Sequence, residues 1–180
     1  MKKLLQGCRK LDRKAQREMV NHLSPLLFPT CRRYSNTQED AKDLLQEALI
    51  LIFNNIKQCS SNEKRVFLAW CRRIAINKAL EKKRKKGFEM ELIGKTEITG
   101  GQAPVINSKL NVDDILNLLN ALPSNQKIVF NLAVIDGYSH KEIADLLTIK
   151  ESNSRTLLTR ARQSLQFLIN KEWKMRKVSK

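Results

Sequence analysis

Aromatic residues, cysteines and histidines are all scarce in this sequence, and each shortage argues against a class of protein. Aromatic residues make up 6% of the 180 positions, and only two histidines are present. The four cysteines form no C-x-x-C pair, so the sequence predicts neither a zinc site nor a disulfide framework. We expect reduced, mostly buried thiols at Cys8, Cys31, Cys59 and Cys71.

Long uncharged apolar runs are also missing. No stretch approaches the ~18 apolar residues that a membrane-spanning helix needs, and the N-terminal residues return to charge too soon for a secretory signal. We therefore expect a cytoplasmic protein. The sequence has no catalytic triad, no glycine-rich phosphate loop and no credible metal cluster. This argues against a nucleic-acid-processing enzyme, and we expect no metal, no cofactor and no small-molecule substrate.

Acidic residues are too few to balance the basic ones. Lysine and arginine number 34 against 18 aspartates and glutamates, which gives a net charge of +16. Residues 1–86 carry net +13, residues 87–110 carry −1 and residues 111–180 carry +4. The densest basic run is 82–86. Such a surplus favours a polyanionic partner, and nucleic acid ranks ahead of an anionic membrane. The alternative for the basic run is a solvated helix end whose cations suit the helix dipole.

The apolar residues, 42% of the chain, suffice for packed cores and recur at helical spacing. The clearest helix follows Thr37, whose hydroxyl can cap it, and its apolar stripe runs to Ile56. A turn over 59–62 leads into a second amphipathic helix that ends in the basic run, and a further helix lies upstream, around Pro25. The first half is predicted to be a three-helix bundle over roughly 10–86.

Segment 87–110 holds four of the six glycines and breaks the helical periodicity, so it is predicted to be a flexible linker. Beyond it a short helix ends at Pro123, and a second helix, capped by Ser124, ends at Gly137. An S-x-x-E capping box at Ser139–Glu142 opens a third helix, which a tight turn and a longer basic helix follow. This order predicts a helix-turn-helix, in an all-α chain of two small domains.

Three motifs occur in order along the chain. Asp40–Glu47 reads D-A-K-D-L-L-Q-E, and Phe67–Arg84 contains F-L-A-W, I-A-I-N and a basic end. Tyr138–Ala144 and Thr159–Arg162 read Y-S-H-K-E-I-A and T-R-A-R, after a Leu-Pro pair at 122–123. Together they resemble regions 2 and 4 of bacterial RNA polymerase sigma factors, specifically the small extracytoplasmic-function (ECF) group.

The resemblance implies a sigma factor that binds core RNA polymerase, directs it to specific promoters and assists promoter melting. It implies a region 2 domain over 8–86, which binds the core enzyme and the −10 element. A linker over 87–110 joins it to a region 4 domain over 111–172, which binds the −35 element. Core RNA polymerase and promoter DNA are the implied partners. An anti-sigma factor that clamps the two halves together is a further implied partner.

The resemblance also implies roles for individual residues. The core-polymerase set is the acidic motif: Asp40, Asp43, Leu44, Gln46 and Glu47. The −10 set comprises the loop that captures an unstacked base and the basic side of the next helix: Ser60, Ser61, Asn62, Lys64, Asn77, Lys78, Lys82, Lys83 and Arg84. The −35 set is the helix-turn-helix: Ser139, Ser152, Asn153, Arg155, Thr156, Thr159, Arg160 and Arg162.

Other interpretations compete with these roles. The carboxylates of Asp40, Asp43 and Glu47 share one helix edge and could form a nuclease metal site, but no further ligand completes it. Trp70 could stack on a base, yet its place on the apolar stripe favours core packing. A stand-alone helix-turn-helix regulator would not need the acidic motif.

The chain departs from the family pattern in its helix-turn-helix. Thr148 occupies the turn position where glycine is usual, and a β-branched residue there is strained if its φ is positive. We therefore expect the turn to be locally reshaped. Family members also commonly have small residues at Ser152-Asn153 and a basic residue at Leu157, so one DNA contact is expected to be missing.

Overall fold

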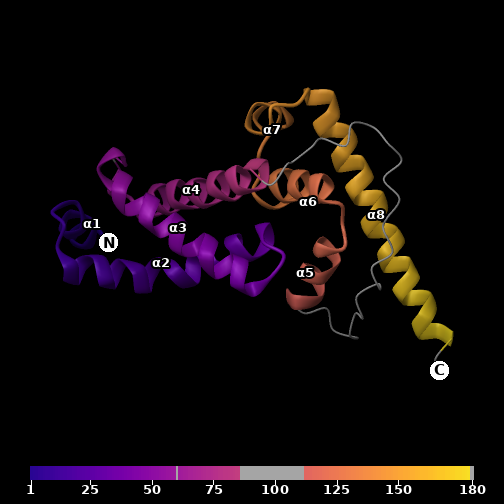
Figure 1. Ribbon diagram of the computed structural model, residues 1–180, viewed down its shortest axis with the longest axis horizontal. Coiled ribbons are helices and arrows are strands. Elements are labelled where there is room, and N and C mark those ends of the chain that lie inside the picture. The colour runs from indigo at the N-terminus through magenta and orange to yellow at the C-terminus, as the bar shows by residue number, and fades with distance from the viewer. Residues whose placement is uncertain (60, 86–111, 179–180) are drawn as a thin grey trace. The chain divides into compact units, whose positions relative to one another are not determined.

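The computed structural model describes residues 1–59, 61–85 and 112–178 (Figure 1). The chain divides into two compact units, Met1–Gly87 and Phe88–Lys180. All regular elements in the described ranges are helical, as the all-α prediction requires. No helix in this part of the chain combines the length and the apolar character that crossing a membrane requires.

The first unit contains the three predicted helices and one that the sequence did not predict. Its elements in chain order are α1 (Lys2–Arg9), α2 (Arg13–Tyr34), α3 (Gln38–Asn55), the 3₁₀ turn η1 (Ile56–Gln58) and α4 (Lys64–Lys85). The predicted cap at Thr37 is confirmed, because its hydroxyl accepts a hydrogen bond from the Asp40 amide at 3.0 Å. The additional helix is α1.

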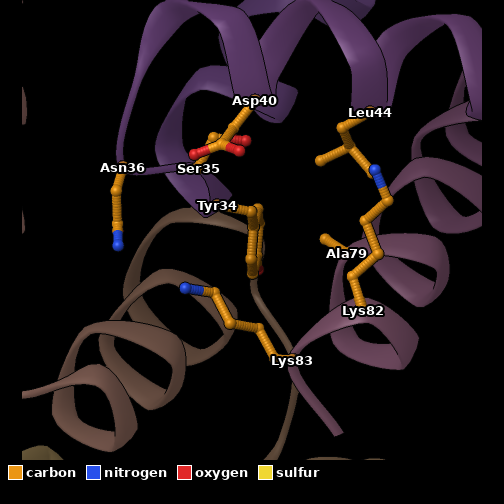
Figure 2. A pocket seen from close by; sticks show the side chains of 8 residues that line it. All are labelled: Tyr34, Ser35, Asn36, Asp40, Leu44, Ala79, Lys82 and Lys83. Carbon is orange, nitrogen blue, oxygen red and sulfur yellow. The ribbon is translucent and has the colours of Figure 1, made fainter. Parts of the chain in front are cut away.

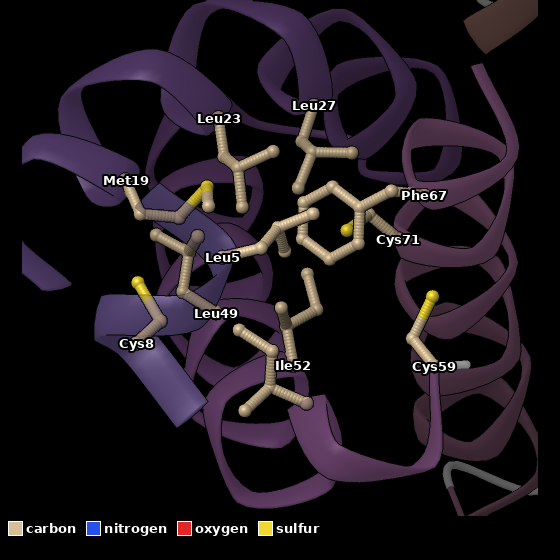
Figure 3. Close-up of a cluster of buried hydrophobic side chains, with 11 residues drawn as sticks. Leu5, Cys8, Met19, Leu23, Leu27, Leu49, Ile52, Cys59, Phe67 and Cys71 are labelled. Atoms are coloured by element: carbon tan, nitrogen blue, oxygen red, sulfur yellow. The ribbon is translucent and has the colours of Figure 1, made fainter. Parts of the chain in front are cut away.

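The core of the first unit includes a hydrophobic cluster to which all four of its described α-helices contribute (Figure 3). The fully buried members include Leu5 and Cys8 from α1, Leu23 from α2, Ile52 from α3 and Phe67 from α4. Burial of large aliphatic and aromatic side chains is the main stabilising contribution in a unit of this size. Because α1 supplies two fully buried side chains, it is an integral part of this unit.

The cysteines belong to this first unit. All four are free thiols and all four are buried. The predicted burial of the thiols is therefore confirmed.

A tight turn fixes α1 against α2. A Cβ atom on Gly7 would lie 2.6 Å from the Cβ of Ala15, so only glycine permits this close approach. Leu11 in the turn has a φ of 63°, and the Asp12 side chain caps α2 by accepting from the Lys14 amide at 2.8 Å. The close approach at Gly7 and the turn at Leu11 and Asp12 therefore help to fix α1 against α2.

The described part of the second unit, residues 112–178, consists of five helical elements. They are α5 (Val112–Asn120), α6 (Ser124–Phe130), the π-helical turn η2 (Asn131–Ile135), α7 (His140–Leu147) and α8 (Glu151–Val178). The prediction that Ser124 caps α6 is wrong: the N-cap is Pro123, whose carbonyl accepts the Lys127 amide at 2.9 Å. Pro123 already has the extended backbone that an N-cap needs, so Ser124 becomes the first helical residue.

The helix-turn-helix is formed by α7 and α8. The predicted capping box is present: Ser139 accepts from the Glu142 amide, and the Glu142 carboxylate accepts from the Ser139 amide at 2.8 Å. Thr148 ends α7 in the left-handed conformation, with φ 56° and ψ 46°. The expected reshaping of the turn is therefore wrong: Thr148 adopts the left-handed conformation that glycine usually provides at this position.

Candidate functional site

The acidic motif lies at the start of α3, where three of its polar residues face solvent. Asp40, Asp43 and Gln46 are exposed. Leu44 is only 3% exposed, so its side chain offers little surface to a partner. The structure thus separates the predicted core-polymerase set into an exposed polar edge and a buried apolar residue behind it. Within the described ranges, no group of three acidic, histidine or cysteine side chains is placed to hold a metal ion.

Glu47, the last residue of the acidic motif, joins α3 to α4. Its carboxylate lies 2.6 Å from the Lys82 ammonium and 3.4 Å from that of Lys78. Lys78 also pairs with Glu81 at 3.2 Å. The hydrogen bond from Lys82, supported by Lys78, holds the pKa of Glu47 below its ordinary value, and the bond to Glu81 raises the pKa of Lys78. Two lysines predicted to contact DNA are thus already bound to carboxylates.

A pocket of about 310 Å³ opens beside this network (Figure 2). Side chains from the end of α2, the start of α3 and the last turns of α4 line it: Tyr34, Ser35, Asn36, Asp40, Leu44, Ala79, Lys82 and Lys83. The lining therefore combines residues of the acidic motif with the first lysines of the basic run.

The predicted base-capturing loop connects η1 to α4, and α1 holds it in place. The Arg9 guanidinium donates to the Cys59 carbonyl at 2.5 Å through Nη2 and to the Asn62 Oδ1 at 2.9 Å through Nη1. Within the loop, the Ser61 hydroxyl accepts the Glu63 amide at 3.1 Å. Ser60 lies outside the described residues. Arg9 is absent from the set predicted from sequence, because its partners are 50 and 53 positions away.

Trp70 packs against the core. Its ring stacks on that of Phe67 with the centroids 5.9 Å apart, and the side chain is half-buried against the hydrophobic cluster. These contacts favour the packing interpretation over base stacking.

The rest of the predicted −10 set lies on α4. Lys64 and Asn77 are exposed, whereas Lys78, Lys82 and Lys83 are half-buried. The side chain of Arg84, and Lys86 as a whole, fall outside the described residues.

The predicted −35 residues fall on α8 and at the start of α7. Five on α8 are exposed and share one side of the helix: Ser152, Arg155, Thr156, Thr159 and Arg162. Asn153 and Arg160 are half-buried, and Ser139, whose hydroxyl caps α7, is exposed. The Thr156 hydroxyl donates to the Ser152 carbonyl at 3.0 Å, so it is engaged with its own helix.

Two contacts fix the start of this helix. Arg155 donates to the Glu151 carboxylate one turn earlier, at 2.5 Å. His140 on α7 is hydrogen-bonded through Nδ1 to the fully buried hydroxyl of Ser154, at 2.9 Å. The second contact joins α7 to α8 and helps to hold the two helices of the helix-turn-helix together.

The two helical units match two family models. Residues 19–89 match the model for sigma-70 region 2, and residues 113–165 match the model for sigma-70 region 4. Among curated proteins, the chain is 27% identical over 179 residues to the ECF RNA polymerase sigma factor SigW of Bacillus subtilis, covering 92% of this chain and 95% of SigW.

Two solved structures have a similar fold. One is the sigma factor RpoE of Bartonella quintana in complex with the anti-sigma factor NepR, with a TM-score of 0.55 and 21% identity over 86% of this chain and 96% of that one. The other is CnrH in complex with the cytosolic domain of CnrY, with a TM-score of 0.51 and 18% identity over 95% of this chain and 97% of that one.

The first unit contains an acidic helix and a basic helix, and the second contains a helix-turn-helix. Both units also match conserved regions of one protein family. The chain belongs to the sigma-70 family of RNA polymerase sigma factors. The curated relatives that it matches are sigma factors of the ECF group, and the chain is a sigma factor that directs RNA polymerase to promoters.

Proposed function

We propose that the exposed polar edge of α3, formed by Asp40, Asp43 and Gln46, is the surface that binds core RNA polymerase. The single observation that carries this proposal is that Asp43 and Gln46 face solvent on a helix whose other side is packed into the core. A partner can therefore reach them without unfolding the unit. Leu44 supports the edge from within the core, and Glu47 supports it through its ion pairs with α4.

The neighbouring helix offers DNA a surface of the opposite charge. The loop at 59–62 captures an unstacked base of the −10 element, and the lysines of α4 hold the phosphates of the same strand. Unstacking a base costs a few kcal/mol, and phosphate contacts and a fitted loop offset that cost. The exposed Asn77 and Lys64 lie along this path.

The second unit reads the −35 element by placing α8 in the major groove. Arg155 and Arg162 are the exposed arginines of the predicted set, and arginine pairs with guanine edges or with phosphate. Ser152, Thr156 and Thr159 lie beside them, whereas Asn153 and Arg160 are less accessible and make lesser contacts. Because Leu157 is apolar, it cannot supply the DNA contact that a basic residue would make there.

Regulation by a protein partner follows from the same surfaces. The solved structure of the similar sigma factor RpoE holds an anti-sigma factor. By analogy, this chain is held inactive by an anti-sigma factor that covers its polymerase-binding and DNA-binding surfaces. It acts in the cytoplasm, as a specificity subunit that has no catalytic activity of its own. Capture of no such partner from uninduced native cells would count against this regulation.

Binding of the full chain to core RNA polymerase tests the proposed surface. A variant carrying Asp43→Asn and Gln46→Ala keeps the buried Leu44 and the Glu47 ion pairs, so the unit still folds. We expect it to bind core polymerase at least about tenfold more weakly than the unchanged chain. The matched control carries Glu18→Gln and Gln6→Ala, which alter the same side-chain chemistry at exposed positions of α2 and α1. Equal affinities for the two variants would contradict the proposal.

A further inference from the structure

The N-terminal helix α1 is docked by its core residues and carries one arginine to the loop at 59–62. Leu5 and Cys8 are fully buried in the core cluster, and Gly7 allows close contact with Ala15. Arg9, the last residue of α1, is therefore held at a fixed place beside the loop. The guanidinium makes the only two side-chain hydrogen bonds described between α1 and the loop.

The two hydrogen bonds span the loop. One acceptor is the Cys59 carbonyl, where η1 ends, and the other is the Asn62 side chain, two residues before α4 begins. A guanidinium has donors in a rigid fork and can hold both acceptors at once, which a single lysine ammonium on a flexible stem does poorly. Together with the Ser61 hydroxyl, which accepts the Glu63 amide, this contact restrains Cys59 and the residues that lead into α4.

We infer that Arg9 is a positioning residue for base capture: it holds Cys59 and Asn62, the two ends of the loop that is proposed to receive the unstacked −10 base. The inference rests on the proposed role of that loop. Arg9 itself does not touch the base. Its contribution is preorganisation, because a loop that is already ordered loses less conformational entropy when the nucleotide binds.

Single-stranded DNA binding by the reconstituted holoenzyme tests this inference. The probe is a random-sequence single-stranded DNA library, and two quantities are measured: the overall affinity and the enrichment of particular bases at one position of the bound pool. We expect Arg9→Gln to weaken binding roughly tenfold and to abolish most of the base enrichment. Its affinity for core polymerase and its thermal unfolding midpoint should stay close to those of the unchanged chain.

Three further variants separate positioning from charge. Lys10→Gln removes the same charge from the exposed neighbour and should leave base enrichment intact. Arg9→Lys keeps the charge and should behave like Arg9→Gln. Asn62→Ala removes one acceptor, and combining it with Arg9→Gln should add little further loss, because the two residues act through one contact.

The outcomes are distinguishable. Full rescue by Arg9→Lys would overturn the inference, because charge alone would then suffice. A second outcome would also overturn the inference on Arg9: base enrichment that is equal in Arg9→Gln and Lys10→Gln but lost in Asn62→Ala. The proposed role of the loop would then still stand. Absence of any base enrichment with the unchanged chain, or enrichment unaffected by Asn62→Ala, would instead remove the proposed role of the loop, and this inference with it.

Discussion

Thr148 shows how one residue can depart from a family pattern without changing the backbone. Its φ of 56° is a conformation in which a Cβ atom crowds the following carbonyl, at a cost of roughly 1–2 kcal/mol. The turn keeps this shape because the Ile149 amide donates to the Ala144 carbonyl at 3.0 Å and α7 and α8 pack on either side. The sequence correctly identified the strained position, and the structure shows that the turn accepts the strain.

Replacing Thr148 by glycine should stabilise the helix-turn-helix. Glycine adopts positive φ freely but loses more backbone entropy on folding, so the net gain should be roughly 0.5–1 kcal/mol. Hydrogen–deuterium exchange of the α7 amides measures it, with slower exchange expected in Thr148→Gly. Thr148→Ala is the control and should gain little, because it retains a Cβ atom. Faster exchange in Thr148→Gly would contradict the assignment of strain.

The buried thiols should be unreactive in the folded protein. Burial raises the pKa of Cys31 to about 11 and that of Cys71 to about 12, and only the thiolate reacts with alkylating reagents. We expect iodoacetamide at pH 8 to leave both residues unmodified in the native protein and to modify all four cysteines in guanidinium, as peptide mass mapping would show. Rapid native modification of Cys71 would show that the core is open there.

Single contacts between distant residues were the part of the site that sequence could not predict. The Ser139–Glu142 capping box was predictable, because its two members are three positions apart. Arg9 was not, because nothing near it in sequence distinguishes it from the other basic residues of the first 20 positions. The burial of Leu44 follows from its place on the apolar stripe, whereas the partners of Glu47 depend on how α4 crosses α3.

The pair of helices α3 and α4 combines the proposed polymerase-binding edge with the proposed DNA-binding surface, and the ion pairs of Glu47 connect the two helices. Lysines that pair with Glu47 are not fully available to phosphate, so the network lowers the positive potential that free DNA meets. At the same time it fixes the long side chains of Lys78 and Lys82 near the surface where the strand is proposed to pass.

Glu47→Gln should change how stability depends on pH. Lys82 and Lys78 hold the pKa of Glu47 below its unfolded value of ~4.3, so the folded state binds this proton less tightly than the unfolded chain. The pairs therefore stabilise the fold above that pH, and their contribution is lost as the pH falls through the lower folded pKa. The loss in Glu47→Gln should stay below about 1 kcal/mol at pH 7, since the side chain is 39% exposed.

The free energy of unfolding is measured by urea titration at several pH values. The fluorescence of Trp70, in a Trp173→Phe background, reports unfolding. The stability difference between Glu47→Gln and the parent should shrink as the medium becomes acidic. Asp43→Asn, an exposed carboxylate on the same helix, is the control and should show a smaller difference at pH 7. A Glu47→Gln deficit that persists unchanged in acid would contradict the ion-pair assignment.

Helices with a long apolar stripe or a recognisable cap were predictable, whereas α1, which has neither, was not. The stripes of α3 and α4 extend over several turns, so their existence followed from periodicity. The eight residues of α1 offer only a few apolar positions between lysines, and its stability depends on a core built from residues far along the chain. The π-helical turn η2 has no local sequence signal, so the break between α6 and Gly137 was not foreseen.

Across the whole chain, the excess positive charge is concentrated in the first half, with net +13 in residues 1–86. This distribution predicts that phosphate contacts dominate the salt dependence of promoter binding, mainly through the first unit. The acidic edge of α3 is an exception within that unit, which suits it to a basic or polar protein surface.

Changing Lys82, Lys83 and Arg84 together to glutamine should flatten the salt dependence of DNA binding by the holoenzyme. Removing one ion pair between a basic side chain and a phosphate should reduce the slope of log K against log salt by about 0.7 on single strands and about 0.9 on duplex. The control variant changes Lys2, Lys3 and Lys10, three exposed basic residues of the first unit, to glutamine. If both variants flatten the slope equally, the basic run has no special role.

The most direct test is transcription by purified core RNA polymerase on fragmented genomic DNA from the native cell, with and without this protein. We predict that the protein produces transcripts from a small set of discrete start sites, that core polymerase alone does not, and that the Asp43→Asn/Gln46→Ala variant loses them. Tight duplex binding by the protein alone, with no discrete start sites when polymerase is added, would contradict its action as a sigma factor.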